Sequence, residues 1–190
     1  MKTLKDYFDS GVSFADMAAA SAEHGALFVA QRARAVVPDD LLARTQAIAA
    51  PLHLLVISED WCIDSQSSLG AITALTERAG NVDLRIVGRD ANPELIDAHL
   101  TNGTARSVPV VIVLDAEYAE LTWWGPRPAP LQQRVATEWK AMEKPERNKE
   151  IRRWYAIDKG RTTLTEIVDL MEHVTAGQPA SATASATAGS

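Results

Sequence analysis

The sequence predicts an α/β fold: a central mixed sheet of about four strands, flanked by helices, with extra helices at both termini. One observation is the near-continuous apolar run LHLLVIS at 52–58, which is typical of a strand buried on both faces of a sheet. A second is that strand-like runs then alternate with segments whose apolar residues recur three and four positions apart. This alternation is typical of the α/β class.

The elements follow in order from these periodicities. Before the first strand, residues 3–35 are predicted to be helical, with Ser13 and Asp16 resembling a capping box. A further helix is predicted over 39–50 and ends at Pro51. After the strand, the spacing predicts a helix that ends at Gly80.

The second half of the chain supplies three more strands and four more helices. The predicted strands are 82–88, 108–115 and 119–125, the last two forming a hairpin through a turn at 115–117. The predicted helices are 93–100, 131–142, 145–157 and 162–174. Thr163 and Glu166 fit a capping box at the start of the last helix.

Four regions are expected from this order. Residues 1–50 form an N-terminal helical extension, and 51–142 form the sheet-containing core. Residues 143–175 form helices packed on that core. The tail, 176–190, is small, polar and repetitive, which predicts disorder.

Composition excludes several function classes. The net charge is −6 without a basic stripe, which argues against a nucleic-acid partner. No apolar run approaches the ~20 residues of a membrane span, and the N-terminus lacks the apolar segment of a secretory signal. One cysteine cannot form an internal disulfide, so we expect a cytoplasmic protein. The four histidines lack metal-site spacing, so no bound metal is expected. No other bound cofactor is expected either. The sequence does not indicate an oligomeric state.

The single cysteine, Cys62, follows a buried strand and opens a helix. A helix N-terminus presents unpaired N–H groups and a partial positive charge, which both stabilise a thiolate. We therefore expect an activated thiol here, since such settings lower a thiol pKa from ~8.5 towards ~7. The alternative interpretation is a small buried hydrophobe without chemistry, which is common for free cysteines.

Three neighbours modify this expectation. Ser65 lies three residues on, on the same helix face, where its hydroxyl can donate a hydrogen bond to the thiolate. Trp61 can shield one side of the sulfur. Asp64 disfavours the thiolate as a like charge, although residues two apart on a helix do not face each other. For Ser65 the alternative is a first-turn serine that satisfies only backbone groups.

Taken together, these residues resemble the thioredoxin-fold family. Trp61-Cys62-Ile63-Asp64-Ser65 stands where a thioredoxin has Trp-Cys-x-x-Cys, directly after the first core strand. Val108-Pro109 opens a strand, as the family's cis-proline does, and Gly125 follows the hairpin. The resemblance covers roughly residues 50 to 142.

The resemblance implies a role for each matching residue. Cys62 would be the attacking thiol, with Ser65 beside it as the second catalytic-site residue. Pro109 would be cis and pack against the sulfur, and Val108 would pair with an extended substrate segment. Trp61 and Gly125 would line the substrate groove.

Two departures from the family narrow the expected function. Ser65 replaces the second cysteine, so release of a mixed disulfide needs an external thiol such as glutathione. Val56 stands where many thioredoxins carry a buried acid. The leading expectation is single-thiol exchange with protein thiols or disulfides, or with glutathione as co-substrate. The alternatives are a redox-inactive binding module and a glutathione-assisted iron–sulfur carrier, for which the glutaredoxin motif is absent.

Outside this motif, the remaining candidates allow two interpretations. The segment from Trp123 to Pro128 is either a strand end with core-packing tryptophans or a groove wall in which Arg127 meets an acidic partner. Arg106 is expected at the surface, and Trp139 and Trp154 in the core.

Overall fold

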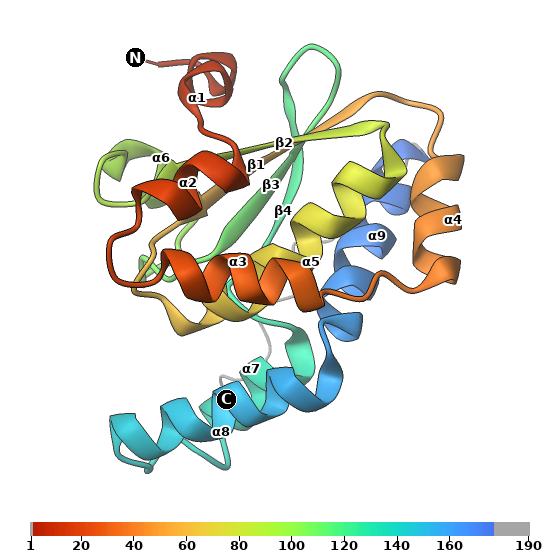
Figure 1. The fold of residues 1–190 in the computed structure, drawn as a ribbon. Coiled ribbons are helices and arrows are strands. Elements are labelled where there is room, and N and C mark those ends of the chain that lie inside the picture. The colour runs from red at the N-terminus through yellow and green to blue at the C-terminus, as the bar shows by residue number, and fades with distance from the viewer. Residues whose placement is uncertain (1, 177–190) are drawn as a thin grey trace.

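The computed structural model describes residues 2–176 and contains one four-stranded sheet in the order β2-β1-β3-β4 (Figure 1). Its strands are β1 (Leu52–Ser58), β2 (Val82–Gly88), β3 (Val110–Leu114) and β4 (Glu120–Trp124). β1 pairs parallel with β2 and antiparallel with β3, and β4 is the hairpin partner of β3. The predicted mixed sheet is confirmed, and the bounds of β1 and β2 agree with the apolar runs that predicted them.

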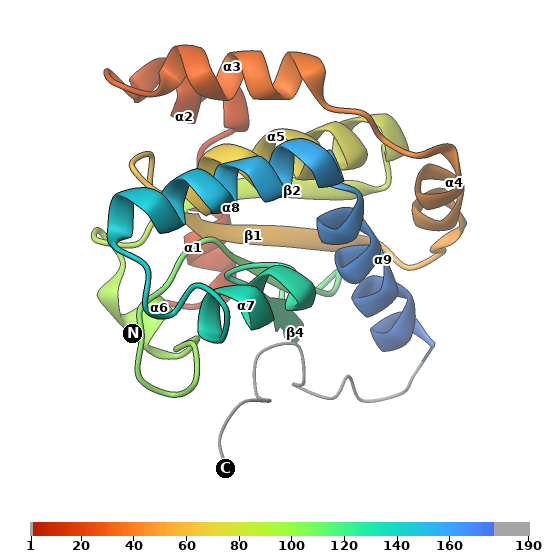
Figure 2. The same cartoon turned by 90° about the horizontal axis from the view of Figure 1, so that it is seen from below.

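Nine helices surround this sheet within the described residues. They are α1 (Leu4–Ser10), α2 (Phe14–Ala20), α3 (Gly25–Arg34), α4 (Asp39–Ala47), α5 (Ile63–Ala79), α6 (Pro93–Asp97), α7 (Ala129–Ala136), α8 (Lys144–Asp158) and α9 (Arg161–Thr175). In Figure 2, α3 lies on the side of α5 that faces away from β1. The helices therefore form more than one layer over the sheet face that α5 covers.

The central strand β1 divides the apolar interior into two clusters. Leu52, Leu54 and Val56 face the cluster formed with α2, α3, α4, α5 and α9. Leu55 and Ile57 face the cluster formed with α1 and α6, which also contains Cys62. Since alternate strand residues point to opposite faces, one continuous apolar run supplies both clusters.

The N-terminal region is three short helices rather than the predicted helical stretch over 3–35. Between α1 and α2, Val12 forms a bridge with Ile86 of β2, each N–H donating to the other carbonyl at 2.9 Å. Ser13 then caps α2, accepting the N–H of Asp16 at 3.1 Å as expected for an N-cap. Pairing with the sheet edge outweighs helix continuity here, because it satisfies backbone groups of β2.

The predicted capping box of the last helix is wrong. The helix begins earlier, with Gly160 as its N-cap, so Thr163 lies within the helix. Glu166 instead accepts the indole N–H of Trp124 at 2.7 Å and the backbone N–H of Ala129 at 2.8 Å. It therefore ties α9 to the end of β4 and the start of α7.

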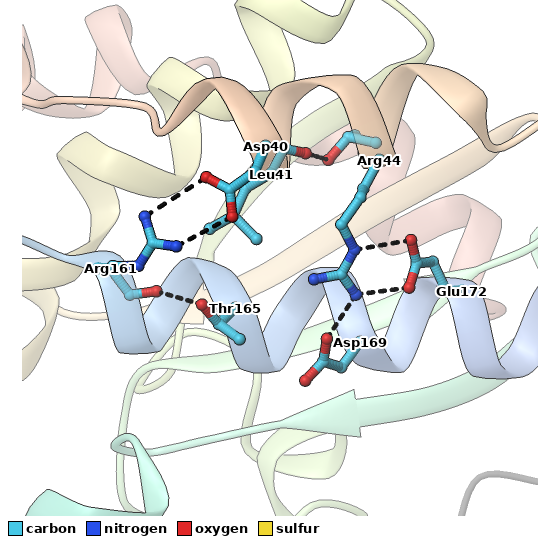
Figure 3. A network of polar contacts seen from close by, with 8 residues as sticks. Asp40, Leu41, Arg44, Arg161, Thr165, Asp169 and Glu172 are labelled. Atoms are coloured by element: carbon cyan, nitrogen blue, oxygen red, sulfur yellow. Dashed lines mark hydrogen bonds and ion pairs between the residues drawn. The ribbon is translucent and has the colours of Figure 1, made fainter.

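The two ends of the chain meet where α4 packs on α9 (Figure 3). Arg44 donates from Nε and Nη2 to the carboxylate of Glu172, at 2.9 and 2.5 Å, and from Nη2 to Asp169 at 2.6 Å. One turn away, Arg161 pairs with Asp40 at 2.9 Å. Exposed pairs of this kind contribute little individually, but the bidentate network fixes how α4 lies on α9.

Within the described part of the chain, no helix is both long enough and apolar enough to cross a bilayer. The predicted disordered tail falls, apart from Ala176, outside the described residues.

A close approach between α3 and α5 requires glycine at position 70. A Cβ added to Gly70 would lie 2.8 Å from the backbone nitrogen of Arg32 and 3.0 Å from the carbonyl carbon of Gln31. Backbone atoms cannot rotate away as a side-chain end can. The outer helix therefore packs on α5 at a distance that only a residue without Cβ permits.

We predict that Gly70→Ala lowers the free energy of unfolding by about 1–3 kcal/mol, the usual cost of overpacking. The sign is informative because alanine in a helix interior is otherwise favoured over glycine by about 1 kcal/mol. Urea unfolding of both variants measures the effect. Gly88→Ala is the control, because its Cβ would lie at an ordinary 3.6 Å from the nearest side-chain atom. A stabilised Gly70→Ala variant would contradict the packing described.

Candidate functional site

The only cysteine lies at the junction between β1 and α5. Cys62 is the N-cap residue of α5 with extended backbone angles, as the sequence predicts. Its thiol donates a hydrogen bond to the carbonyl oxygen of Val108 at 3.0 Å. The residue is 8% exposed and belongs to the apolar cluster on the α1 and α6 face. The sulfur is therefore at the end of the central strand, mostly covered.

The structure brings the sulfur together with the start of β3 and the end of β4. The Val108-Pro109 and Gly125-Pro126 peptide bonds are both cis. Gly125 has a φ of +142°, and a Cβ there would lie 2.3 Å from the carbonyl oxygen of Pro109. Only glycine fits both the backbone angle and this approach. The backbones of Val108, Pro109 and Gly125, all three buried, thus adjoin one another beside Cys62.

Trp61 lies at this site but its ring is turned towards β2. It is 49% exposed, and the guanidinium of Arg89 lies 4.7 Å from its ring centroid. The cation–π contact holds the ring at the surface, at a strength of about 0.5–1 kcal/mol for exposed pairs. Trp61 therefore presents an apolar face next to the thiol loop without covering the sulfur completely.

The pKa of the Cys62 thiol is raised, in contrast to the activation expected from its helix-start position. Burial is the largest cause, because it disfavours the charged form, and the negative charge of Asp64 adds to it. The backbone N–H and hydroxyl of Ser65, with the N–H of Asp64, act in the opposite direction and only partly offset the rise. Burial and the Asp64 charge thus favour the protonated thiol, the form that donates to Val108.

Ser65 is fully buried one turn into α5. With the thiol protonated, its hydroxyl makes no hydrogen bond within the described residues. It is one of the groups that favour an ionised sulfur. Its position on the face of Cys62 agrees with the sequence-based expectation, and its hydroxyl is unused until the sulfur carries charge.

A buried ion pair lies directly behind the thiol. Asp64, 3% exposed, accepts hydrogen bonds from Arg127 Nε at 2.9 Å and from the Tyr155 hydroxyl at 3.1 Å, both at Oδ1. Arg127 Nη2 lies 2.8 Å from Oδ2, so the guanidinium binds the carboxylate in a bidentate manner. Burial raises the pKa of Asp64, and Arg127 and the Tyr155 hydroxyl oppose that rise.

The loop before the cysteine is held from both ends of the chain. Gln66 donates its amide N–H to the carbonyl oxygen of Asp60 at 2.7 Å and accepts from Arg152 of α8 at 2.9 Å. The Asp60 carboxylate accepts the hydroxyl of Ser21, which follows α2, at 2.7 Å. The terminal helices thus fix the thiol loop rather than lie apart from it.

The sequence predicts only part of this arrangement. The acidic partner of Arg127 is Asp64 of the same chain, 63 positions earlier, not an external one. Tyr155 and Arg152 were not anticipated, because nothing in a solvated, highly charged helix sequence indicates which side chains reach a distant site. Arg106 is half-exposed and pairs with Asp97, as expected of a surface residue.

The tryptophans that the sequence assigned to the core differ in how deeply they are buried. Trp124 is fully buried and binds Glu166, which agrees with core packing, while Trp123 is only partly buried. Trp139 is buried as expected, and Trp154 packs against the same small cluster at its edge. Within residues 2–176, no three His, Cys, Asp or Glu side chains lie close enough to share a metal ion.

Comparisons with known proteins agree with this geometry. The model of a family described as thioredoxin matches residues 11–140. No curated protein matches the sequence. A solved structure of a protein of unknown function from Pseudomonas aeruginosa is 22% identical, covers 90% of this chain and 98% of its own, and gives a TM-score of 0.71. An HIV epitope scaffold is 20% identical, with the same coverage and a TM-score of 0.70. The matched region begins well before residue 50, so it includes α2, α3 and α4.

We predict that Arg127→Met lowers the free energy of unfolding by about 3–5 kcal/mol at neutral pH, since it leaves the Asp64 carboxylate buried and unpaired. The pKa of Asp64 is already raised in the folded state and rises further without Arg127. A group whose folded pKa is raised destabilises the fold as pH rises through the folded value. The deficit of the variant should therefore shrink as pH falls and Asp64 becomes protonated.

Denaturant unfolding of wild type and variant between neutral and acidic pH measures this. Arg134→Met is the matched control, because Arg134 lies on the adjacent helix and is half-exposed. Its Nε lies 4.0 Å from Oε1 of Glu138, which makes a weak ion pair. Its effect should stay within about 0.5 kcal/mol at every pH. If Arg127→Met lowers the free energy of unfolding equally at every pH, the loss does not come from an unpaired Asp64 carboxylate.

Proposed function

Because this chain belongs to the thioredoxin family, we propose that it carries out thiol–disulfide exchange through a single thiol, that of Cys62. One observation carries the proposal: the sulfur lies 3.0 Å from the carbonyl oxygen of Val108, immediately before the proline that opens β3. An extended chain that pairs with the backbone at this point would bring its own sulfur next to Cys62. Trp61 offers the apolar surface on one side.

The exchange has two steps that balance with an external thiol. The Cys62 thiolate attacks a disulfide R–S–S–R′, forming Cys62–S–S–R and releasing R′–S⁻, which takes up a proton. Glutathione then attacks, returning Cys62 to the thiol and leaving R–S–S–glutathione. Ser65 cannot form a disulfide, so no internal group performs the second step. The mixed disulfide is therefore the species that persists when free thiols are scarce.

In the proposed exchange, the rate is limited by how little of the Cys62 thiol is ionised. The thiol must lose its proton against burial and the charge of Asp64 before it attacks. A substrate that displaces the Val108 hydrogen bond would leave the Ser65 hydroxyl as a donor to the new thiolate. The protein is thus suited to selective, slow exchange with a docked substrate rather than to general disulfide reduction.

The same burial favours a second candidate function, a binding module of the thioredoxin fold without redox chemistry. Its supporting observation is that Cys62 is hydrogen-bonded to Val108 and only 8% exposed, and that this burial raises the pKa of its thiol. In that case an extended partner would have to reach the backbone of Val108, Pro109 and Gly125, which is buried in the free protein, and the sulfur would be one of its apolar contacts. The two functions differ in whether capture of a partner depends on the sulfur and is reversed by a reductant.

We predict that native protein incubated with oxidised glutathione gains one glutathione, at Cys62, detected by intact mass spectrometry. The rate should rise with pH without a plateau below about 8.5, because the pKa of the thiol is raised and only the thiolate reacts. Dithiothreitol should remove the adduct. Cys62→Ser should gain none, and urea-unfolded protein gives the rate of an uncovered thiol. Native protein that stays unmodified at about pH 9, while the unfolded protein reacts, would favour the binding module.

We also predict that Asp64→Asn increases the alkylation rate of Cys62 at neutral pH. Removing the negative charge lowers the pKa of the thiol, so more thiolate is present. Iodoacetamide labelling, with folding checked by circular dichroism, measures the rate. Asp97→Asn is the control, since Asp97 is a half-exposed surface carboxylate paired with Arg106. Equal changes in both variants would show that the effect is not local.

A further inference from the structure

A cavity of about 490 Å³ lies between the end of α3, α5 and α8, away from the thiol site. Its volume is within the range of roughly 300–1,000 Å³ typical of small-molecule sites. None of Cys62, Val108, Pro109 or Gly125 lines it. The cavity is therefore a separate feature of the fold, formed only because helices from both ends of the chain pack on α5.

The lining of this cavity contains no acidic residue and three basic ones, which are Arg34 at the end of α3, Arg152 of α8 and Lys159, the C-cap residue of α8. Because the whole chain has 25 acidic and only 19 basic residues, this local excess is not background composition. Like charges gathered without counter-charges repel one another, at a cost that a bound anion would remove. The charges thus favour an anionic ligand.

The three cations have donors to spare. Arg152 uses one N–H to bind Gln66, which leaves four of its five donors. Arg34 and Lys159 make no side-chain hydrogen bond or ion pair within residues 2–176. Both stand at helix C-terminal ends, where each helix contributes about half a negative charge. Three full positive charges exceed these two partial ones, so the cavity stays positive.

Part of the remaining wall of the cavity is apolar, next to the polar side chains of Gln31, Ser67 and Tyr155. Val36, 59% exposed, lies on one side, and Ala71 and Ala156 lie on α5 and α8. An exposed valine next to small apolar side chains is stabilised when hydrocarbon covers it, because apolar surface is then removed from water. A wholly hydrated ion such as inorganic phosphate would leave this wall uncovered.

From the cations, the apolar wall and the volume together, we propose that this cavity binds a small organic anion with a carboxylate or phosphate head and an apolar body. The head pairs with Arg34, Arg152 and Lys159, and the body covers Val36, Ala71 and Ala156. Arginine favours such heads, because its planar N–H groups match two oxygens at once. Binding here requires no reaction at Cys62, although Arg152 and Tyr155 of the cavity lining also bond to Gln66 and Asp64 beside the thiol.

Isothermal titration calorimetry at low ionic strength tests the proposal on the full chain. The probes are octanoate and octyl phosphate, each below its micellar concentration, with octanol and inorganic phosphate as partial probes. We expect saturable one-site binding of at least one of the two anions, and binding at least about tenfold weaker for octanol and for inorganic phosphate. The preferred anion identifies the head group. Absence of saturable binding by both anions, or equal binding of inorganic phosphate, would overturn the proposal.

Single-residue variants test whether the anion binds in this cavity. Arg152→Ala and Arg34→Ala should each weaken the anion at least about threefold, because each removes a charge from the rim. Arg153→Ala is the matched control, since the neighbouring arginine on the same helix lines a different hollow beside Trp154. Arg34 makes no internal side-chain bond, so its variant tests the site even if Arg152→Ala perturbs the fold. An unchanged affinity in Arg34→Ala, or an equal loss in Arg153→Ala, would place the anion elsewhere and refute the assignment.

Discussion

The arrangement around the thiol depends on one buried ion pair, Asp64 with Arg127. A carboxylate taken out of water is stable only if its charge and its lone pairs are satisfied. Here one guanidinium and the Tyr155 hydroxyl do so, and they come from the loop after β4 and from α8. The pair therefore fixes two segments distant in sequence, the loop after β4 and α8, against the first turn of α5, at whose start Cys62 lies.

The state of the sulfur is a balance in which burial prevails. The helix start, the backbone N–H groups and the Ser65 hydroxyl all favour the thiolate. Burial and the Asp64 charge favour the thiol, and together they are larger. Arg127 does not reverse this, because its charge is already committed to Asp64. The site is consistent with a thiol that reacts only when a substrate changes its surroundings.

The parts of the fold that could be predicted are those with local signals. The strand 52–58 is apolar at nearly every position and the helix that follows it ends at a glycine, so the end of β1 and of α5 followed from sequence. The helix start after Ser13 agrees with the cap predicted there, but no helical periodicity encodes the pairing of Val12 with Ile86, 74 positions apart, that separates α1 from α2. Likewise, Glu166 three residues after Thr163 looks like a cap, but its partner is the indole of Trp124.

The candidate site, too, was predictable only where the sequence carries a local signal. Motif spacing was sufficient to bring Cys62, Val108, Pro109 and Gly125 together, because their positions follow from strand order. The sign of the thiol pKa shift was not accessible, since it depends on how deeply the sulfur is buried and on a charge whose partner is 63 residues away. Local rules describe what a helix start does to an exposed thiol, and tertiary packing determined that this thiol is not exposed.

Contacts with the thiol loop give the helices at both ends of the chain a structural role. A loop at the end of a sheet is ordinarily among the more mobile parts of a fold. In this protein, Ser21 from the N-terminal helices binds Asp60, and Arg152 from α8 binds Gln66, so the loop before the thiol is held on two sides. Gly70 lets α3 approach α5 closely, which keeps the N-terminal helices near enough to contribute. The helices added at both ends thus restrict the loop that carries Cys62, and because that restriction keeps the sulfur covered, they help to set its ionisation.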